Sequence, residues 1–361
     1  MVIIDGSVLK NLIVYGKFSK GDILKDPKSF YHLFLNQIVQ MIDQFNVHQS
    51  NKMVIAVDSK TKIKCNGTRN YWREVYYHRF AKDIMILNKE GNIKFPHYKI
   101  RPPKDDGVDW DTINKCYSEL LVILKEHTDV IVVKRGGIEA DEICAVIAQY
   151  VDAGTIKSNQ ESNDQEENVI FTNDKDMVQV ISAYTTLYNP YQGGYIAEGC
   201  TEKEKTIFFL TGDTTDCVPS CKAGYAKKTW DKVYNDDLMT MFNNIPVTKA
   251  KPREDPDLLM KRYEFNRKVM DISIESLPPK ITKMIYDEFT KPQPTYNMRT
   301  LSRELRKLRL GLYVEEGCQS IFDRKEKFEF RKKSTRQSIA EKKEKMEEFK
   351  GNRIADRFGV E

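Results

Sequence analysis

The sequence has no run of 18 apolar residues in its 361 positions, so we expect no membrane-spanning helix. The apolar stretch near the first residue is interrupted by Asp5 and Lys10, which is unlike a secretory signal peptide. The seven cysteines are odd in number and scattered, as in an intracellular protein whose thiols stay reduced. Cys217 and Cys221 are the only close pair, and because no histidine lies nearby they are a weak candidate for a zinc site.

A large excess of one charge is also absent. The net charge is +5, and the segment 323–361, with 13 basic and 9 acidic side chains, holds +4 of it. Residues 1–322 are therefore close to neutral, which excludes a uniformly basic nucleic-acid-binding protein. If this chain binds a polyanion, basic patches must coexist with a concentrated acidic region elsewhere.

Short apolar runs rich in β-branched residues alternate with helical patterns. The runs cover 2–5, 53–58, 129–134 and 168–174, and the helical patterns cover 30–45, 110–126 and 139–151. Strands that are apolar on both faces, separated by amphipathic helices, predict a doubly wound, mainly parallel sheet of the α/β class. In such sheets the functional crevice lies beyond the carboxyl ends of the strands.

Acidic residues lie at the ends of all four predicted strands, either as the last residue or after the next turn. They are Asp5, Asp58, Glu139, Asp141, Glu142, Asp174 and Asp176. A single aspartate in such a place is usually an N-cap or turn residue. Carboxylates from four strand ends would instead meet at one edge of the sheet. Two like charges 4 Å apart repel by about 1 kcal/mol in water and about 4 kcal/mol at an effective dielectric of 20, so the set predicts a shared metal site.

Two further acids, Asp213 and Asp216 in LTGDTTDCVP, follow an apolar helical segment and bring the set to nine carboxylates. Ligation by acids without histidine suits a hard cation such as Mg²⁺ or Mn²⁺. A set this large favours two ions, which in phosphoryl transfer lie about 3.5–4 Å apart and bind the attacking and leaving oxygens.

The segment RNYWREVYYHRFAK (69–82) combines cations with aromatic side chains. Its aromatic residues include Tyr71, Trp72 and Tyr76, and its cations are Arg69, Arg73, Arg79 and Lys82; all are candidates for binding nucleic acid. Aromatic rings that stack on bases beside cations that contact phosphates are typical of single-strand binding. The alternative is an amphipathic helix whose aromatic residues belong to the core.

A second basic segment, KAGYAKKTWDK (222–232), predicts contacts to a duplex backbone. The candidate residues are Lys222, Gly224, Lys227, Lys228 and Thr229. Such contacts position a protein on nucleic acid without reading its sequence. The alternative is a solvated helix face.

Five segments resemble, in order, the acidic motifs of the flap endonuclease/5′-nuclease family: VIID, VIAVD, GIEADE, FTNDKDMVQ and TGDTTDCVP. YWREVYYHR followed by DWDTINKCYSELL is most similar to the T-even-phage ribonuclease H branch. The resemblance covers about residues 1–322. It implies a PIN-like 5′-nuclease core with a helical arch over about 60–108 and a C-terminal all-helical DNA-binding region.

The resemblance also implies an activity and a role for each acid. The activity is that of a Mg²⁺-dependent 5′→3′ exonuclease and flap endonuclease with ribonuclease H activity, acting in replication on branched DNA and RNA–DNA hybrids. The first ion would be held by Asp5, Asp58, Asp141 and Asp174, with Glu139 nearby through water, and the second by Asp176, Asp213 and Asp216. Glu142 stands where this branch usually has aspartate and is included in the candidate metal set. Arg73 and either Arg79 or Lys82 resemble the cations that grip the scissile phosphate.

We expect three parts: an α/β nuclease domain (1–205), a helical duplex-DNA-binding domain with a helix–turn–helix-like motif (206–322), and a charged tail (323–361). Ile354 and Phe358 in the tail are faintly similar to sliding-clamp-binding peptides, although the glutamine and the paired aromatic are missing. A sliding clamp or a single-strand-binding protein is therefore a candidate partner, with a solvated tail as the alternative. We expect a monomer.

Two other functions compete with this interpretation. One is a PIN-type ribonuclease for single-stranded RNA, which the second-half duplex-binding segment argues against. The other is a non-catalytic nucleic-acid-binding protein on the same scaffold. Such a protein would have no reason to keep nine repelling carboxylates beside a polyanion.

Overall fold

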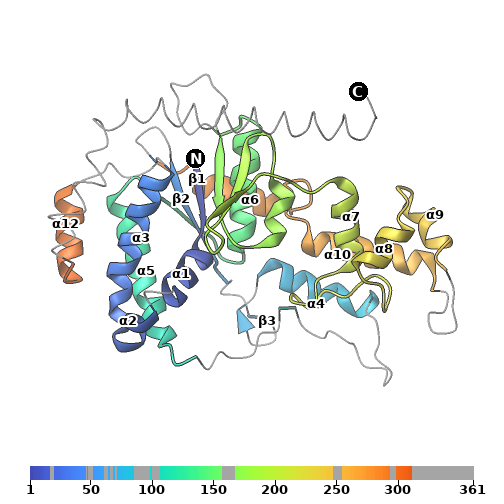
Figure 1. Ribbon diagram of the computed structural model, residues 1–361, viewed down its shortest axis with the longest axis horizontal. Coiled ribbons are helices and arrows are strands. Elements are labelled where there is room, and N and C mark those ends of the chain that lie inside the picture. The colour runs from blue at the N-terminus through green and yellow to red at the C-terminus, as the bar shows by residue number, and fades with distance from the viewer. Residues whose placement is uncertain are drawn as a thin grey trace, which may run out of the picture.

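The computed structural model describes residues 1–16, 20–45, 47, 52–60, 64–65, 68–69, 71–84, 98–99, 106–156, 167–246, 254–292 and 298–310. A six-stranded sheet lies at the centre of this described part (Figure 1). Its strands, in spatial order, are β5 (Ile131–Lys134), β2 (Met53–Val57), β1 (Val2–Asp5), β6 (Asn168–Phe171), β7 (Thr185–Asn189) and β8 (Gly194–Ile196). All neighbours pair in parallel except β8, which is antiparallel to β7. The predicted α/β class with a mainly parallel sheet is confirmed.

Helices cover both faces of the sheet. One face carries α1 (Gly6–Tyr15), α2 (Lys20–Lys25), η1 (Pro27–Ser29), α3 (Phe30–Gln44) and α5 (Trp110–His127), with α12 (Met298–Lys307) outermost against α5. The other face carries α6 (Ala140–Asp152), η2 (Lys175–Val180) and α11 (Pro279–Phe289). Successive side chains of β1 point to opposite faces of the sheet, which explains this arrangement. Ile4 packs into the core of the first face and Ile3 into that of the second.

A helical region extends from one end of the sheet, on the right in Figure 1. It contains α4 (Trp72–Ile84), α7 (Glu202–Thr211), α8 (Lys227–Val233), α9 (Leu238–Asn243) and α10 (Pro256–Met270). A two-stranded ribbon, β3 (Lys64–Cys65) with β4 (Thr68–Arg69), precedes α4. Arg262 of α10 connects α4 with the loop between α7 and α8, because its Nε donates to the Ile84 carbonyl at 2.9 Å and its Nη1 donates to the Cys221 carbonyl at 3.0 Å.

The helices of the second half do not all belong to this extension. Ile281, Ile285 and Phe289 of α11 pack into the core beneath α6. Leu301 and Leu305 of α12 pack into the core of the opposite face. The predicted range 206–322 therefore includes helices that complete the α/β part, because both sheet faces need apolar cover.

The predicted tail (323–361) and much of the predicted arch lie outside the described residues. Within the described ranges, no helix is both long enough and apolar enough to cross a membrane.

Gly212 makes the turn after α7 possible. Its φ of +71° and ψ of −179° lie in a region that is essentially restricted to glycine. The Val218 amide donates to the Asp213 carbonyl at 2.7 Å, which folds the following loop back against Gly212. A Cβ at Gly212 would lie 2.4 Å from the Pro219 carbonyl oxygen and 2.5 Å from that of Val218. The loop that carries Asp213 and Asp216 therefore requires this glycine.

We expect Gly212→Ala to lower the free energy of unfolding by about 3 kcal/mol, because backbone strain adds to the overlap with two carbonyl oxygens. Gly154→Ala is the matched control: its φ is +68°, but a Cβ there meets no atom within 4 Å, so we expect a loss of about 1 kcal/mol. Urea unfolding followed by circular dichroism measures both. Equal losses for the two variants would show that the close contacts at Gly212 do not matter.

Candidate active site

The carboxyl ends of the parallel strands hold the first three acids. Asp5 is the last residue of β1 and the N-cap of α1, where its Oδ1 accepts the amides of Ser7 (2.9 Å) and Val8 (3.2 Å). Asp58 directly follows β2. Asp174 follows β6 and caps η2 by accepting the Asp176 amide at 2.9 Å. Because β2, β1 and β6 are parallel neighbours, these side chains share one edge of the sheet.

Hydrogen bonds tie this edge to the start of α6, where the segment IEADEI lies. Asp58 Oδ1 accepts the Ala140 amide at 2.8 Å, and Asp58 Oδ2 accepts the Ser7 hydroxyl. The Thr172 hydroxyl donates to Asp5 Oδ2 at 3.4 Å. The strand ends and the acidic N-terminus of α6 are therefore held together by direct contacts.

The charges of these acids act on one another. Burial, followed by the charges of Asp58 and Asp141, raises the pKa of Asp5 to about 7. Burial and the charge of Asp141 also raise the pKa of Asp174. Each of these carboxylates is thus costly to ionise while its neighbours are charged, and an added cation would relieve that cost.

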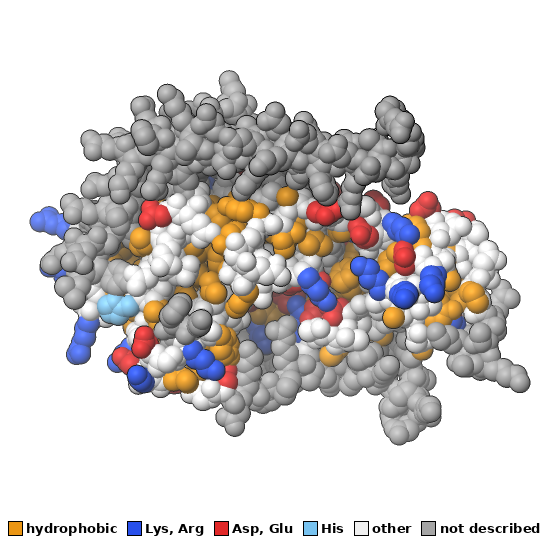
Figure 2. Space-filling model, in the orientation of Figure 1, with side chains coloured by type: hydrophobic (Ala, Val, Ile, Leu, Met, Phe, Trp, Pro, Cys, Tyr) orange, Lys and Arg blue, Asp and Glu red, His pale blue; other side chains and the backbone are white. Residues whose placement is uncertain are grey.

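The second group of acids comes from η2 and the loop after α7. Burial, then the charges of Asp174 and Asp213, raise the pKa of Asp176 to about 7. Asp213 Oδ1 accepts the Thr215 amide at 2.7 Å, and the exposed Lys175 Nζ lies 3.6 Å from Asp213 Oδ2. The charge of Asp216 also raises the pKa values of Asp174 and Asp176. The two groups therefore share one electrostatic environment. Acidic and basic side chains lie next to one another near the middle of the face in Figure 2.

Glu142 differs from the other acids because its oxygens already have partners. Its side chain is completely buried; Oε2 accepts the Glu139 amide at 3.0 Å, and Oε1 accepts Trp72 Nε1–H at 2.7 Å. Oε1 also lies 2.8 Å from Arg73 Nε. These contacts differ from the predicted ligand role. They make Glu142 the anchor of the first turn of α4 against α6.

Arg73 lies inside the acidic group. Its side chain is 3% exposed, and Nη1 lies 3.5 Å from Asp141 and 3.9 Å from Glu139, in addition to the contact with Glu142. Its Nη2 is buried and has no hydrogen-bond partner among the described residues. A guanidinium in this position balances part of the acidic charge and keeps one donor for a further acceptor.

Lys99 is a site residue that the sequence analysis missed. Its Nζ lies 2.8 Å from Glu139 Oε1 and 3.3 Å from Asp216 Oδ2. Its backbone N–H donates to the Asp216 carbonyl at 3.1 Å, and its φ is +50°. Burial alone would lower the pKa of Lys99, but the charges of Glu139, Asp141 and Asp216 outweigh it and hold that pKa well above its usual value. No motif marks this lysine, which stands in a Lys- and Pro-rich stretch.

The donor chemistry of the site fits a hard divalent cation. Five of the nine candidate acids, Glu139, Asp141, Glu142, Asp213 and Asp216, lie within 4 Å of Arg73, Lys99 or Lys175. Acidic oxygen donors in excess of the basic side chains, without histidine, are suited to Mg²⁺ or Mn²⁺. In the described part of the chain, however, no three acidic, histidine or cysteine side chains are gathered closely enough to hold an ion. Two of the acids that resemblance assigns to metal, Glu139 and Asp216, contact Lys99 instead.

The aromatic residues of α4 have several partners within the protein. Tyr76 packs against Phe80 and Phe265, with ring centroids 4.6 and 5.9 Å away. Trp72 is bound to Glu142, while Tyr71 is half-buried beneath Lys60. This packing supports the alternative that these rings are structural. Arg79 is exposed, whereas the side chains of Arg69 and Lys82 lie outside the described residues.

The second basic segment divides into a buried and an exposed part. Lys222 is 2% exposed, and its Nζ lies 3.7 Å from Glu254. We expected this ammonium to be accessible to a phosphate backbone, but it is buried. Gly224, with a φ of +73°, is exposed in the turn before α8. Lys227 and Lys228 at the start of α8 are exposed, and Thr229 is half-buried. The exposed lysines remain able to contact a phosphate backbone.

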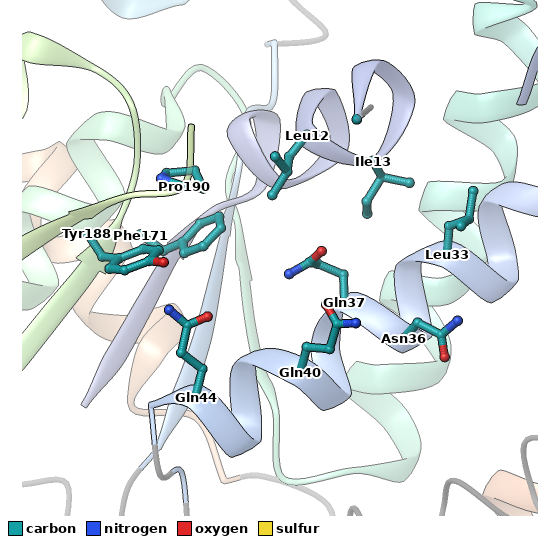
Figure 3. Close-up of a pocket in the computed structure, with 11 residues that line it drawn as sticks. Leu12, Ile13, Leu33, Asn36, Gln37, Gln40, Gln44, Phe171, Tyr188 and Pro190 are labelled. Atoms are coloured by element: carbon teal, nitrogen blue, oxygen red, sulfur yellow. The ribbon is translucent and has the colours of Figure 1, made fainter. Parts of the chain in front are cut away.

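A separate pocket of about 400 Å³ lies between α1 and α3 (Figure 3). Asn36, Gln37, Gln40 and Gln44 of α3 line one side, and Tyr188 lines the other. Because these carboxamides carry no charge, the pocket adds no carboxylate ligands to the acidic site.

No family model matches this chain. Its fold is similar to that of a bacteriophage T5 protein co-crystallized with metal ions, at 12% identity and a TM-score of 0.49 over 80% of this chain and 98% of the other. It is also similar to a bacteriophage T5 flap endonuclease in a complex with DNA and metal ions, at 10% identity and a TM-score of 0.48 over 87% and 98%. Identities this low leave the roles of individual residues to this chain's own geometry.

Proposed function

We propose that this protein is a divalent-metal-dependent, structure-specific 5′ nuclease that hydrolyses phosphodiesters at the 5′ ends of DNA flaps and RNA primers. The observation that carries the proposal is the convergence of acids from β1, β2, β6 and the start of α6, which direct hydrogen bonds hold together. Burial, followed by the charges of neighbouring acids, raises the pKa values of Asp5 and Asp174 there. Keeping so many carboxylates together is unfavourable for a protein that only binds a polyanion. Their order along the chain is that of the family whose motifs the sequence resembles.

The proposal assigns the acids to two ions. Asp5, Asp58, Asp141 and Asp174 would hold the first, with Glu139 nearby through water, and Asp176, Asp213 and Asp216 would hold the second. When bound, Mg²⁺ or Mn²⁺ would activate water and stabilise the negative charge of the reacting phosphate. Glu142 is assigned to positioning, because its oxygens are bound to Trp72, Arg73 and the Glu139 amide.

The basic residues would orient the substrate. Arg73 Nη2, which is buried and unpartnered among the described residues, would donate to a phosphate oxygen near the acids. Arg79 and Lys82 on α4 would contact the single-stranded 5′ portion, and Lys227 and Lys228 on α8 would contact the duplex. Substrates that combine a duplex with a 5′ strand, including branched DNA and RNA–DNA hybrids, would engage both regions.

A sliding clamp or a single-strand-binding protein remains a candidate partner through the tail.

The test offers 5′-labelled flap DNA and a nicked RNA–DNA hybrid to the protein, with MgCl₂ or with EDTA. We expect short labelled products in MgCl₂ and at least about a thousandfold slower cleavage in EDTA, since the ions supply the charge stabilisation. A shifted but uncut substrate in an electrophoretic assay would identify a binding protein instead. Cleavage of single-stranded RNA alone would identify a PIN-type ribonuclease.

A further inference from the structure

The Lys99 side chain occupies the space between acids of the two proposed metal groups. Glu139 is the N-cap of α6, and Asp216 lies in the loop after α7, so the two carboxylates come from separate elements. Lys99 Nζ lies 2.8 Å from the first and 3.3 Å from the second. A single ammonium thus bridges the acids near the first proposed ion and those of the second.

We propose that Lys99 is the counter-ion of the metal-free site and competes with divalent cations for Glu139 and Asp216. This inference rests on the proposed function. In the absence of metal, the ammonium relieves repulsion between the two groups of acids. When metal binds, the Lys99 side chain leaves these carboxylates and turns toward solvent.

Charge and distance favour this exchange. Mg²⁺ carries two charges and approaches oxygen to about 2.0–2.1 Å, whereas the Lys99 ammonium carries one charge at 2.8 Å from Glu139. Glu139 also has capacity for a further partner, because its buried Oε2 accepts no hydrogen bond among the described residues. A divalent ion therefore interacts more strongly with the same oxygens than the lysine does.

The released ammonium has a short path to water. The Lys99 side chain is 22% exposed, so its Nζ can be hydrated after a rotation of the flexible stem. The backbone need not move, because the Lys99 amide is bound to the Asp216 carbonyl and Tyr98 packs on Tyr77 with ring centroids 5.6 Å apart. The same cation would then stand at the mouth of the loaded site, where an anionic substrate arrives.

Lys175 provides a matched control, because it is also a lysine beside one of the acids. Its Nζ lies 3.6 Å from Asp213, but its side chain is 74% exposed and forms one such contact. Lys99→Met and Lys175→Met each remove one positive charge near the site. Non-specific electrostatics would therefore tighten metal binding similarly in both variants, whereas direct competition predicts a large effect for Lys99 alone.

Calorimetric titration of MnCl₂ into the protein, without nucleic acid, measures the competition independently of activity. We expect Lys99→Met to bind Mn²⁺ about tenfold more tightly than wild type, and Lys175→Met to stay within about twofold. Lys99→Arg, which keeps the charge, should bind within about threefold of wild type. Unchanged or weaker binding by Lys99→Met would overturn the inference.

A second measurement needs no substitution. After reductive ¹³C-methylation of the lysines, which keeps their charge, the Lys99 methyl resonance should move toward the position of exposed lysines when MgCl₂ is added to wild type. A resonance that stays in place while Mg²⁺ binds contradicts the exchange. If wild type binds neither Mn²⁺ nor Mg²⁺, the proposed function itself fails, which is a different outcome from metal binding that Lys99 does not affect.

Discussion

Asp174→Asn is expected to slow Mg²⁺-dependent cleavage of a 5′ flap by at least about 10³-fold, which corresponds to about 4 kcal/mol in the activation barrier. Asp174 follows β6 and belongs to the proposed first ion. The substitution removes a negative ligand with little change in shape. Asparagine still offers the oxygen that accepts the Asp176 amide, so the turn of η2 should persist.

The Asp174→Asn variant should still bind flap DNA. A loss of cleavage with binding retained would show that Asp174 acts in the hydrolysis step. Fluorescence anisotropy with labelled flap DNA in EDTA should give a dissociation constant within about threefold of wild type, because one repelling charge is lost and no phosphate contact is removed. Asp287→Asn is the control for cleavage, since its exposed carboxylate pairs with Lys283 on α11 and is not among the acids of the site. Wild-type cleavage by Asp174→Asn would refute its assignment as a ligand.

The central sheet was predictable because its strands are buried on both faces and therefore appear as continuous apolar runs. The predicted helices at 30–45, 110–126 and 139–151 agree with α3, α5 and α6 to within one residue at each end. The strand β7 and the edge strand β8 were not predicted. Their sequences, TTLYN and GYI, are partly polar and only partly buried, so they lack the continuous apolar signal of the other strands.

Acids such as Asp5, Asp58 and Asp174 could be placed at one edge of the sheet from sequence, because each ends or follows a strand of a parallel sheet. The partners of those acids could not. Lys99 reaches Glu139 and Asp216 through a left-handed backbone turn that no local pattern reveals. Lys222 was expected on the surface, yet it is buried beside Glu254, which follows it by 32 positions. Contacts between segments that are distant in sequence have no signal in a single chain.

The ion pair between Arg73 and Glu142 should control the stability of the site. Both side chains are almost fully buried, with 2.8 Å between Arg73 Nε and Glu142 Oε1. Removing one partner of a buried pair leaves a charge without compensation, which costs about 3–5 kcal/mol. Burial raises the pKa of Glu142 to about 8, so protonation of Glu142 offsets part of this cost when Arg73 is absent. We expect Arg73→Met to lower the free energy of unfolding by about 3 kcal/mol. This value is at the lower end of that range because Glu142 keeps its hydrogen bonds from Trp72 and the Glu139 amide. Urea unfolding in EDTA measures the loss without any contribution from metal.

A double-mutant cycle tests whether Glu142 is the reason for that loss. Arg73→Met combined with Glu142→Gln should recover about 2 kcal/mol, since a neutral carboxamide needs no cation and its oxygen can still accept a hydrogen bond. Additive losses would mean that Arg73 stabilises the protein through Asp141 or Glu139 instead. A loss below about 1 kcal/mol in the single variant would mean that the buried carboxylate does not depend on Arg73, and the positioning role of Glu142 would have to be abandoned. The stability of the first turn of α4 thus distinguishes an acid that anchors a helix from one that holds an ion.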